Sequence, residues 1–296
     1  MASDPLDSGH LIGHVKDADY FEVPRFMAEQ LGGHAGHVPV PQVYEGEPVW
    51  GGIGTLVEPL DLHITKFMVL EVVAAVIMVV LFVWLANRMS RSDRPKGRIW
   101  NFLETMLVFI RDEVARPAIG KHDADKFLPF LWTLFFFVLG CNLLGMLPWL
   151  GSPTGAIATT GALAITTFAV VVGSGMSKMG FIGFFKSLVP HMDLPKPIAI
   201  FLLPMIFAIE VLGLLIKHFV LSVRLVANML AGHLVLGVLV AFIAAAYHSN
   251  WFYAVAPASI LGATALSMLE LFVAFLQAYI FTFLSALFIG MAVHPH

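Results

Sequence analysis

The sequence predicts an all-α protein that crosses a membrane several times. Of its 296 residues 58% are hydrophobic and the mean hydropathy is +0.84, whereas soluble domains are about 45–50% apolar. The apolar residues form runs at least as long as the roughly 20 residues that a membrane-spanning helix needs. Beyond Lys217, only Arg224 and Glu270 carry a formal charge, and both lie deep inside such runs. We expect upright helices followed by two long, strongly tilted antiparallel helices.

Residues 1–62 form an acidic extension that differs from the rest of the chain. Within its first 60 residues Lys16 and Arg25 are outnumbered by carboxylates, which are Asp4, Asp7, Asp17, Asp19, Glu22, Glu29, Glu45, Glu47 and Glu58. This composition is typical of a loosely ordered polar tail. The extension lacks the pattern of a signal peptide and is too acidic for a mitochondrial presequence. We therefore expect residues 63–296 to form the membrane-embedded domain.

The first predicted span covers residues 64–87. Basic residues follow it closely: Arg88, Arg91, Arg94, Lys96 and Arg98. Because basic loops stay on the cytoplasmic side, this cluster places the N-terminus outside. Residues 99–116 mix apolar and charged side chains, so they are expected to lie along the cytoplasmic interface or pack on the bundle. The bacterial inner membrane is the simplest location, with the mitochondrial inner membrane as the alternative.

Residues 127–177 predict a pair of spans. They contain no charged residue, and their length suits two helices of about 20 residues each. The turn between them is marked by proline, glycine and serine at residues 148–155. Lys178 and Lys186 then return the chain to the cytoplasmic side, and prolines at 190, 195 and 197 separate this pair from the next segment.

Two later segments are too long for upright spans. Residues 197–246 carry no turn signal and predict one helix of about 75 Å. A helix of that length fits a hydrocarbon core of about 30 Å only at a tilt of roughly 65°, beyond the usual range of about 0–40°. Residues 254–293 repeat this pattern. Small residues allow close approach of the helices, and these are Ala227, Ala231, Gly232, Ala274 and Ala278.

Polar side chains recur along the first long segment. Arg224 and Asn228 are four residues apart and share a helix face. His233 lies about 13 Å beyond Arg224 along the helix axis. Glu210 precedes Arg224 by about 21 Å, toward the cytoplasm.

The second long segment supplies polar partners. Glu270 and Gln277 are seven residues apart and share a face. In an antiparallel pair with Gln277 level with Arg224, Glu270 falls opposite about residue 231, beside His233. We therefore expect a ladder of polar side chains between the two helices. Arg224, Asn228 and Gln277 lie in the middle of this ladder, and His233 and Glu270 lie toward the outside.

This ladder has the chemistry of a proton path. Glu270 and His233 can exchange protons near physiological pH once burial and mutual contact act on them. Arg224 cannot, because a guanidinium keeps its proton under these conditions. Two half-paths that are separated by a permanent cation would carry protons without letting them leak directly from one side of the membrane to the other.

Each of these residues also has a less specific interpretation. Arg224 could snorkel to an interface, and His233 could be an interhelical hydrogen bonder. Glu270 could form a static buried ion pair with Arg224. Glu210 could simply be solvated in a headgroup region.

Three stretches carry a resemblance to a known family. They are RLVANMLAGH at residues 224–233, ELFVAFLQAYIF at residues 270–281 and GCNLLGMLP at residues 140–148. Together they resemble subunit a of the F-type ATP synthase, over roughly residues 60–296. The order of histidine on the first long segment and glutamate on the second is that of mitochondrial-type sequences.

The resemblance implies a role for each member of the ladder. Arg224 would face a rotating ring of c subunits, displace the proton from each arriving carboxylate and prevent leakage. An outer half-channel would run through Asn228, His233, Glu270 and Gln277, and a cytoplasmic one would involve Glu210. The implied partners are the c ring, b-type peripheral stalk subunits and the rest of the ATP synthase, with one copy of this chain per complex. No cofactor, metal or nucleic acid is implied.

Other functional classes find less support. A stand-alone secondary transporter or channel also uses intramembrane charges, but the internal repeats and broken helices common in transporters are missing. The sequence has neither hydrolase motifs nor a nucleotide-binding loop. Neither a cysteine nor a carboxylate at a recognisable ligand spacing supports a metal site at His10, His14, His34 and His37, so an exposed polar tail is expected. Cys141 is the only cysteine, so no internal disulfide is expected.

Overall fold

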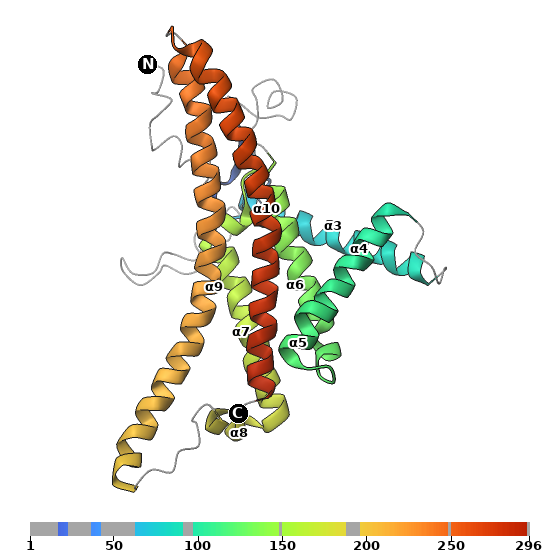
Figure 1. Cartoon of the computed structure of the whole chain (residues 1–296), viewed down its shortest axis with the longest axis vertical. Coiled ribbons are helices and arrows are strands. Elements are labelled where there is room, and N and C mark those ends of the chain that lie inside the picture. The colour runs from blue at the N-terminus through green and yellow to red at the C-terminus, as the bar shows by residue number, and fades with distance from the viewer. Residues whose placement is uncertain are drawn as a thin grey trace. The chain divides into compact units, whose positions relative to one another are not determined.

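The structure, a computed structural model, describes residues 17–22, 37–42, 63–90, 97–147, 150–187, 196–247 and 250–294. Five helices in these ranges are long and apolar enough to cross a membrane. They are α3 (Lys66–Met89), α6 (Ala124–Gly145), α7 (Ile157–Met179), α9 (Lys196–Ala246) and α10 (Phe252–Val293) (Figure 1). The prediction of an all-α polytopic membrane protein is confirmed.

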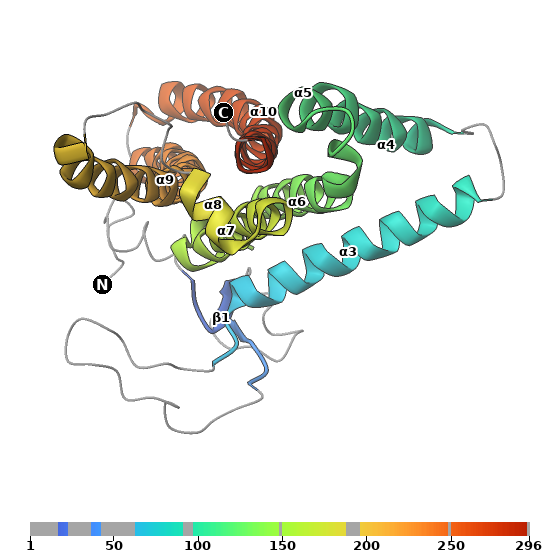
Figure 2. The same ribbon diagram turned by 90° about the horizontal axis from the view of Figure 1, so that it is seen from below.

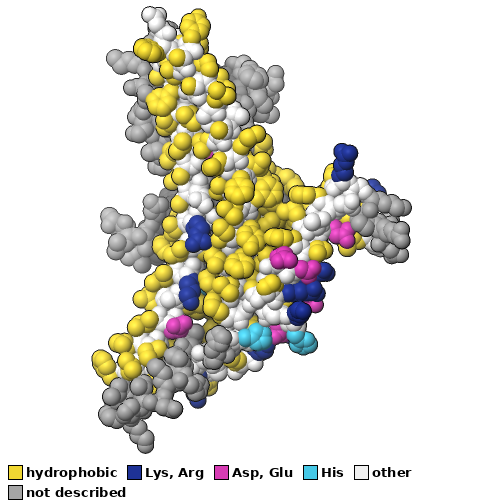
Figure 3. All heavy atoms as spheres, in the orientation of Figure 1, with side chains coloured by type: hydrophobic (Ala, Val, Ile, Leu, Met, Phe, Trp, Pro, Cys, Tyr) yellow, Lys and Arg dark blue, Asp and Glu magenta, His cyan; other side chains and the backbone are white. Residues whose placement is uncertain are grey.

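The two long helices are continuous, as predicted. α9 has 51 residues and α10 has 42, and proline occurs inside each, at Pro204 and Pro257. Hydrophobic side chains cover most of the visible face of both helices (Figure 3). Their tilt in the membrane stays a prediction, which rests on the length argument given above.

Contacts within the chain divide it into two compact units. One contains Met1–Ile77, Gly140–Ala156 and Met229–Leu271, and the other contains Met78–Leu139, Ile157–Asn228 and Phe272–His296. Both α9 and α10 pass from one unit into the other.

The acidic extension contains a small sheet that the sequence analysis did not predict. β1 (Tyr20–Glu22) pairs antiparallel with β2 (His37–Pro39), and β1 lies close to the start of α3 (Figure 2). The carbonyl oxygen of Ala18 accepts the N–H of Lys66 at 2.8 Å, and Oδ1 of Asp17 accepts the N–H of Phe67 at 3.3 Å. The extension thus satisfies backbone donors at the N-terminus of α3 that have no partner within the helix.

The connection between α6 and α7 forms where it was predicted. It contains the 3₁₀ helix η2 (Pro153–Gly155); Pro148 lies outside the described residues. Gly151 has φ +74°, a left-handed conformation that favours glycine. The hydroxyl of Thr154 donates to Oδ1 of Asn142 at 2.7 Å and lies 2.8 Å from the hydroxyl of Ser152. These buried polar contacts fix the turn against the end of α6.

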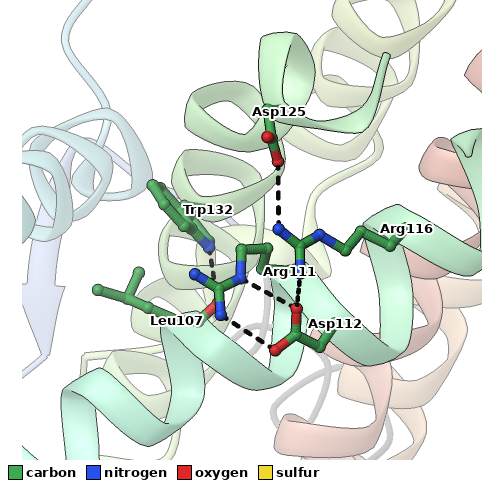
Figure 4. A network of polar contacts seen from close by, with 6 residues as sticks. All are labelled: Leu107, Arg111, Asp112, Arg116, Asp125 and Trp132. Atoms are coloured by element: carbon green, nitrogen blue, oxygen red, sulfur yellow. Dashed lines mark hydrogen bonds and ion pairs between the residues drawn. The ribbon is translucent and has the colours of Figure 1, made fainter. Parts of the chain in front are cut away.

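Three short helices form the charged segment that was predicted not to span. α4 (Arg98–Phe109) continues into the π-helix η1 (Ile110–Ala115) and α5 (Arg116–Ile119), and charged side chains gather over this segment (Figure 3). Asp112 accepts hydrogen bonds from Arg111 at 3.0 Å and from Arg116 at 2.7 Å (Figure 4). The Arg111 hydrogen bond holds the pKa of the Asp112 carboxyl below its usual value. The position of this segment at the membrane interface stays a prediction.

A second charged cluster joins three helix ends in the same unit. Lys178, in the last turn of α7, donates to Asp123 at 2.5 Å, and Lys126 donates to it at 3.2 Å. His294, just after α10, lies 3.3 Å from the same carboxylate. The hydrogen bonds from Lys178 and then Lys126 lower the pKa of Asp123 from 3.8 to about 2. The resulting stabilisation is present above the unfolded pKa and is lost as the pH falls through about 2.

Candidate functional site

The polar residues of the two long helices fall into two groups, one in each unit. The unit that contains Phe272–His296 holds Glu210, Arg224, Asn228 and Gln277, and the other holds His233 and Glu270. Within each unit α9 and α10 run antiparallel, as predicted. In one unit His218 packs on Phe288 while Asn228 bonds Gln277, and in the other Gly232 faces Glu270 while Gly262 faces Leu239.

Asn228 and Gln277 link α9 to α10 directly. Nδ2 of Asn228 donates to Oε1 of Gln277 at 2.8 Å. Gln277 is buried, and so are Ala274 and Ala278 on either side of it; such small residues let helices approach closely. Nε2 of Gln277 has no hydrogen-bond partner among the described residues. The pair is therefore fixed by one hydrogen bond and retains a spare donor.

The register differs slightly from the one assumed from the sequence. Gln277 was set level with Arg224, whereas its hydrogen bond goes to Asn228, one helical turn further along α9. Oε1 of Gln277 could accept a hydrogen bond from the Asn228 amide or from the Arg224 guanidinium, so the donor types alone do not decide between the two partners. Residue spacing alone does not decide between them either.

Arg224 lies at the edge of the packed face of α9. Leu221, Ser222 and Leu225 around it are buried, Arg224 itself is half-buried, and Val223 is exposed. Within the described ranges, Arg224 makes no hydrogen bond or ion pair. A permanent charge inside an apolar helix is costly without a partner. This arrangement does not support a static ion pair within the chain.

Glu210 occupies an exposed position on α9. It lies about 21 Å before Arg224 along the axis and about 40° from it around the helix. Both residues lie in the continuous helix α9, and the role of Glu210 stays a prediction.

In the other unit, Glu270 packs onto Gly232, the residue before His233. A Cβ atom built at Gly232 would collide with Oε1 of Glu270 and lie 3.1 Å from its Cδ. This places Glu270 where the sequence analysis expected it, opposite about residue 231. Oε1 of Glu270 and Nε2 of His233 are both buried, and neither has a hydrogen-bond partner among the described residues.

The unpartnered atoms define the chemistry of this group. Buried polar atoms are almost always hydrogen-bonded, and exceptions call for an explanation such as bound water or a catalytic role. A carboxyl oxygen and an imidazole nitrogen both accept and release protons. His233 and Glu270 are therefore suited to exchange protons with water that enters the site.

Gly232 tests the importance of this packing. Under the function that the resemblance implies, Gly232→Ala should lower proton-driven ATP synthesis by about tenfold or more, because the added methyl group must displace the Glu270 carboxyl group. The matched control is Gly213→Ala on the same helix, where an added Cβ meets nothing within 4 Å. Rates in vesicles with equal amounts of assembled complex provide the comparison. Parent activity in Gly232→Ala would show that the position of Glu270 is not critical.

Two further observations complete the site. His218 is buried, and its Nε2 has no hydrogen-bond partner among the residues that the structure describes. The sequence analysis gave no role to His218, and its location in a run of apolar residues was the only signal. No group of three side chains suited to hold a metal ion occurs in the part of the chain that the structure describes. His10, His14 and His34 lie outside that part.

Comparison with known proteins points to one family. The profile described as ATP synthase A chain matches residues 68–290. ATP synthase subunit a of Myxococcus xanthus is 45% identical over 80% of this chain and 76% of the relative, and that of Chloroherpeton thalassium is 41% identical over 79% and 67%. The Anaeromyxobacter sp. protein of the same name is 38% identical over 96% of this chain and 64% of the relative.

Proposed function

Because the chain belongs to the ATP synthase A chain family, we propose that it guides protons through two offset half-channels to a rotating c ring, with Arg224 as the barrier between them. The family and the five apolar helices make it a membrane protein of a bacterial ATP synthase. The proposal concerns the path itself and the residues that form it.

The observation that carries this proposal is the unpaired charge of Arg224. Its guanidinium is half-buried on an apolar helix and makes no ion pair within the described part of the chain. Its natural counter-charge would be a carboxylate brought by another subunit, which a planar guanidinium can bind bidentately. A ring of c subunits would present such carboxylates one after another. Arg224 would displace the proton from each of these carboxylates. Because a guanidinium is a permanent cation, it would also block direct passage of protons between the two half-channels.

The remaining polar residues would supply the two half-channels. Protons entering from outside would reach Nε2 of His233 and Oε1 of Glu270, neither of which has a hydrogen-bond partner in the described part of the chain, and would then pass the Asn228–Gln277 pair. Protons leaving toward the cytoplasm would pass Glu210. Because the two long helices would be strongly tilted, Arg224 would lie near the middle of the membrane, facing the ring.

The same proposal covers the position of the chain in the complex. Residues 1–62 would lie outside the bacterial inner membrane and residues 63–296 would form the channel domain. The chain would catalyse no bond chemistry itself. One copy would act beside the c ring and b-type stalk subunits. A stand-alone transporter is the alternative, and purification without a small apolar partner would favour it.

The access of water from each side tests the two half-channels. In a Cys141→Ser background, Ser267→Cys lies one turn from Glu270 and Leu214→Cys lies one turn from Glu210. A membrane-impermeant thiol reagent should label Ser267→Cys from outside only and Leu214→Cys from the cytoplasm only. Val76→Cys, on an exposed apolar position of α3, is the control and should react from neither side. Labelling of both test positions from one side would refute the proposal.

A further inference from the structure

His218 is buried in the packed face of α9 and has one satisfied and one unsatisfied nitrogen. Only 4% of the residue is exposed. Its Nδ1 lies 2.9 Å from the carbonyl oxygen of Leu214. Because a carbonyl only accepts, Nδ1 carries a proton and, in the neutral ring, Nε2 presents a lone pair. Nε2 is buried and has no partner among the described residues.

Aromatic side chains from two other helices enclose the imidazole ring. The centroid of Phe168 on α7 lies 5.3 Å away, edge-on, and that of Phe288 on α10 lies 5.1 Å away. On the next turn of α9, the buried Ser222 donates its hydroxyl proton to Thr160 at 3.0 Å. The only proton of Ser222 is thus used, which leaves its oxygen free to accept from a water molecule.

The charged groups around His218 are few. Lys217 is its neighbour in sequence, and Glu210 and Arg224 lie on the same helix. α7 carries no charge before Lys178, and α10 carries none between Glu270 and its end. The ring meets no carboxylate on the two helices that enclose it, so nothing there fixes it as a permanent cation.

The position of His218 along α9 relates it to the proposed path. It lies about 12 Å beyond Glu210 and about 9 Å before Arg224 along the helix axis. It is also only about 80° around the helix from Glu210. Around the helix it is about 120° from Arg224. His218 thus lies between Glu210 and Arg224 along the axis of α9, on the packed face of this helix.

We propose that His218 is a proton-relay residue of the half-channel that begins at Glu210, with Nε2 as the site that binds a buried water. This inference rests on the proposed function. In the uptake step an O–H bond of a hydronium ion breaks as an Nε2–H bond forms, which gives an imidazolium ion and water. Release to the next water reverses the step, and the Nδ1–H bond to Leu214 is unchanged throughout.

Two substitutions separate this role from packing. His218→Phe keeps a ring between Phe168 and Phe288 but has no nitrogen, and His218→Gln keeps an N–H and an acceptor but cannot titrate. In vesicles with the whole ATP synthase, we expect both variants to make ATP at least about fivefold more slowly than the parent at equal assembly. When the cytoplasmic pH is varied, the rate of ATP synthesis by the parent should change in a step in the pH range where histidine titrates. This step should be absent from His218→Phe and His218→Gln.

Phe288→Leu is the packing control, because it loosens the same pocket without removing a nitrogen. It should retain the pH step even if its rate falls. A parent-like rate and pH profile in His218→Gln would overturn the inference, and this variant decides alone if His218→Phe does not assemble. Arg224→Ala, measured in the same vesicles, separates the two proposals. If Arg224→Ala keeps its ATP synthesis activity, the proposed two-half-channel function is wrong. If Arg224→Ala loses this activity but the His218 variants keep it, only the proposed relay role of His218 is wrong.

Discussion

Arg224→Ala should abolish proton-driven ATP synthesis while the complex still assembles. The substitution removes a half-buried charge that makes no ion pair within the described chain, so little native packing is lost. We expect the rate to fall by about 100-fold or more, the scale on which removal of one preorganised charged or polar group acts. ATP synthesis in vesicles energised by a proton gradient measures the effect, with assembly checked by purification of the whole complex.

Two other substitutions show whether a positive charge at residue 224 is enough or whether the planar guanidinium group is needed. Arg224→Lys should also fail, because a buried lysine can lose its proton and lacks the planar fork that binds a carboxylate bidentately. Lys217→Ala removes an exposed charge from the same helix and should change the rate less than about twofold. Near-normal synthesis in Arg224→Lys would argue against a barrier that must never titrate.

Exchanging His233 and Glu270 should restore part of what either single exchange removes. His233→Glu alone places two carboxyl groups in one buried site, and Glu270→His alone places two imidazoles there. Each single change should slow ATP synthesis by about tenfold or more, since like groups disfavour each other's charged forms. The double exchange restores one acid and one imidazole, and we expect it to be about tenfold faster than the single variants.

The control for this exchange is His233→Gln with Glu270→Gln, which keeps polar side chains but removes both titratable groups. It should be as slow as the slower single exchange. Equal losses in the double exchange and in both single exchanges would show that His233 and Glu270 do not act as a pair. Gly232 must stay unchanged in every variant, because its missing side chain provides the room for residue 270.

The sequence was sufficient to predict the spans and their connections. Apolar runs predicted α3, α6 and α7 to within a few residues, because length and burial in lipid determine them. Glycine and proline marked the turn before α7, where Gly151 has a positive φ. Residues 197–246 and 254–293 contain single glycines and prolines but no cluster of them that would form a turn, which predicted the uninterrupted α9 and α10.

The features that the sequence did not predict depend on contacts between distant segments. The pairing of β1 with β2 involves three residues on each side, too few for a periodic pattern. Gln277 accepts its hydrogen bond from Asn228 and is therefore level with Asn228, one turn beyond Arg224. This depends on how the two helices pack and not on the spacing within either one. The sequence does not show that His218 is enclosed by the rings of Phe168 and Phe288, because these residues come from two other helices.

The most direct test of the barrier is passive proton flux through Arg224→Ala complexes in the absence of nucleotide. Vesicles that hold the purified ATP synthase are given an inward proton gradient, with a c-ring carboxylate blocked so that the ring cannot turn. The parent should carry no flux above that of empty vesicles. Arg224→Ala should carry a steady proton flux, because the two half-channels would then be joined. Flux no higher than that of the parent would contradict the account, since Arg224 would not be what separates the two paths.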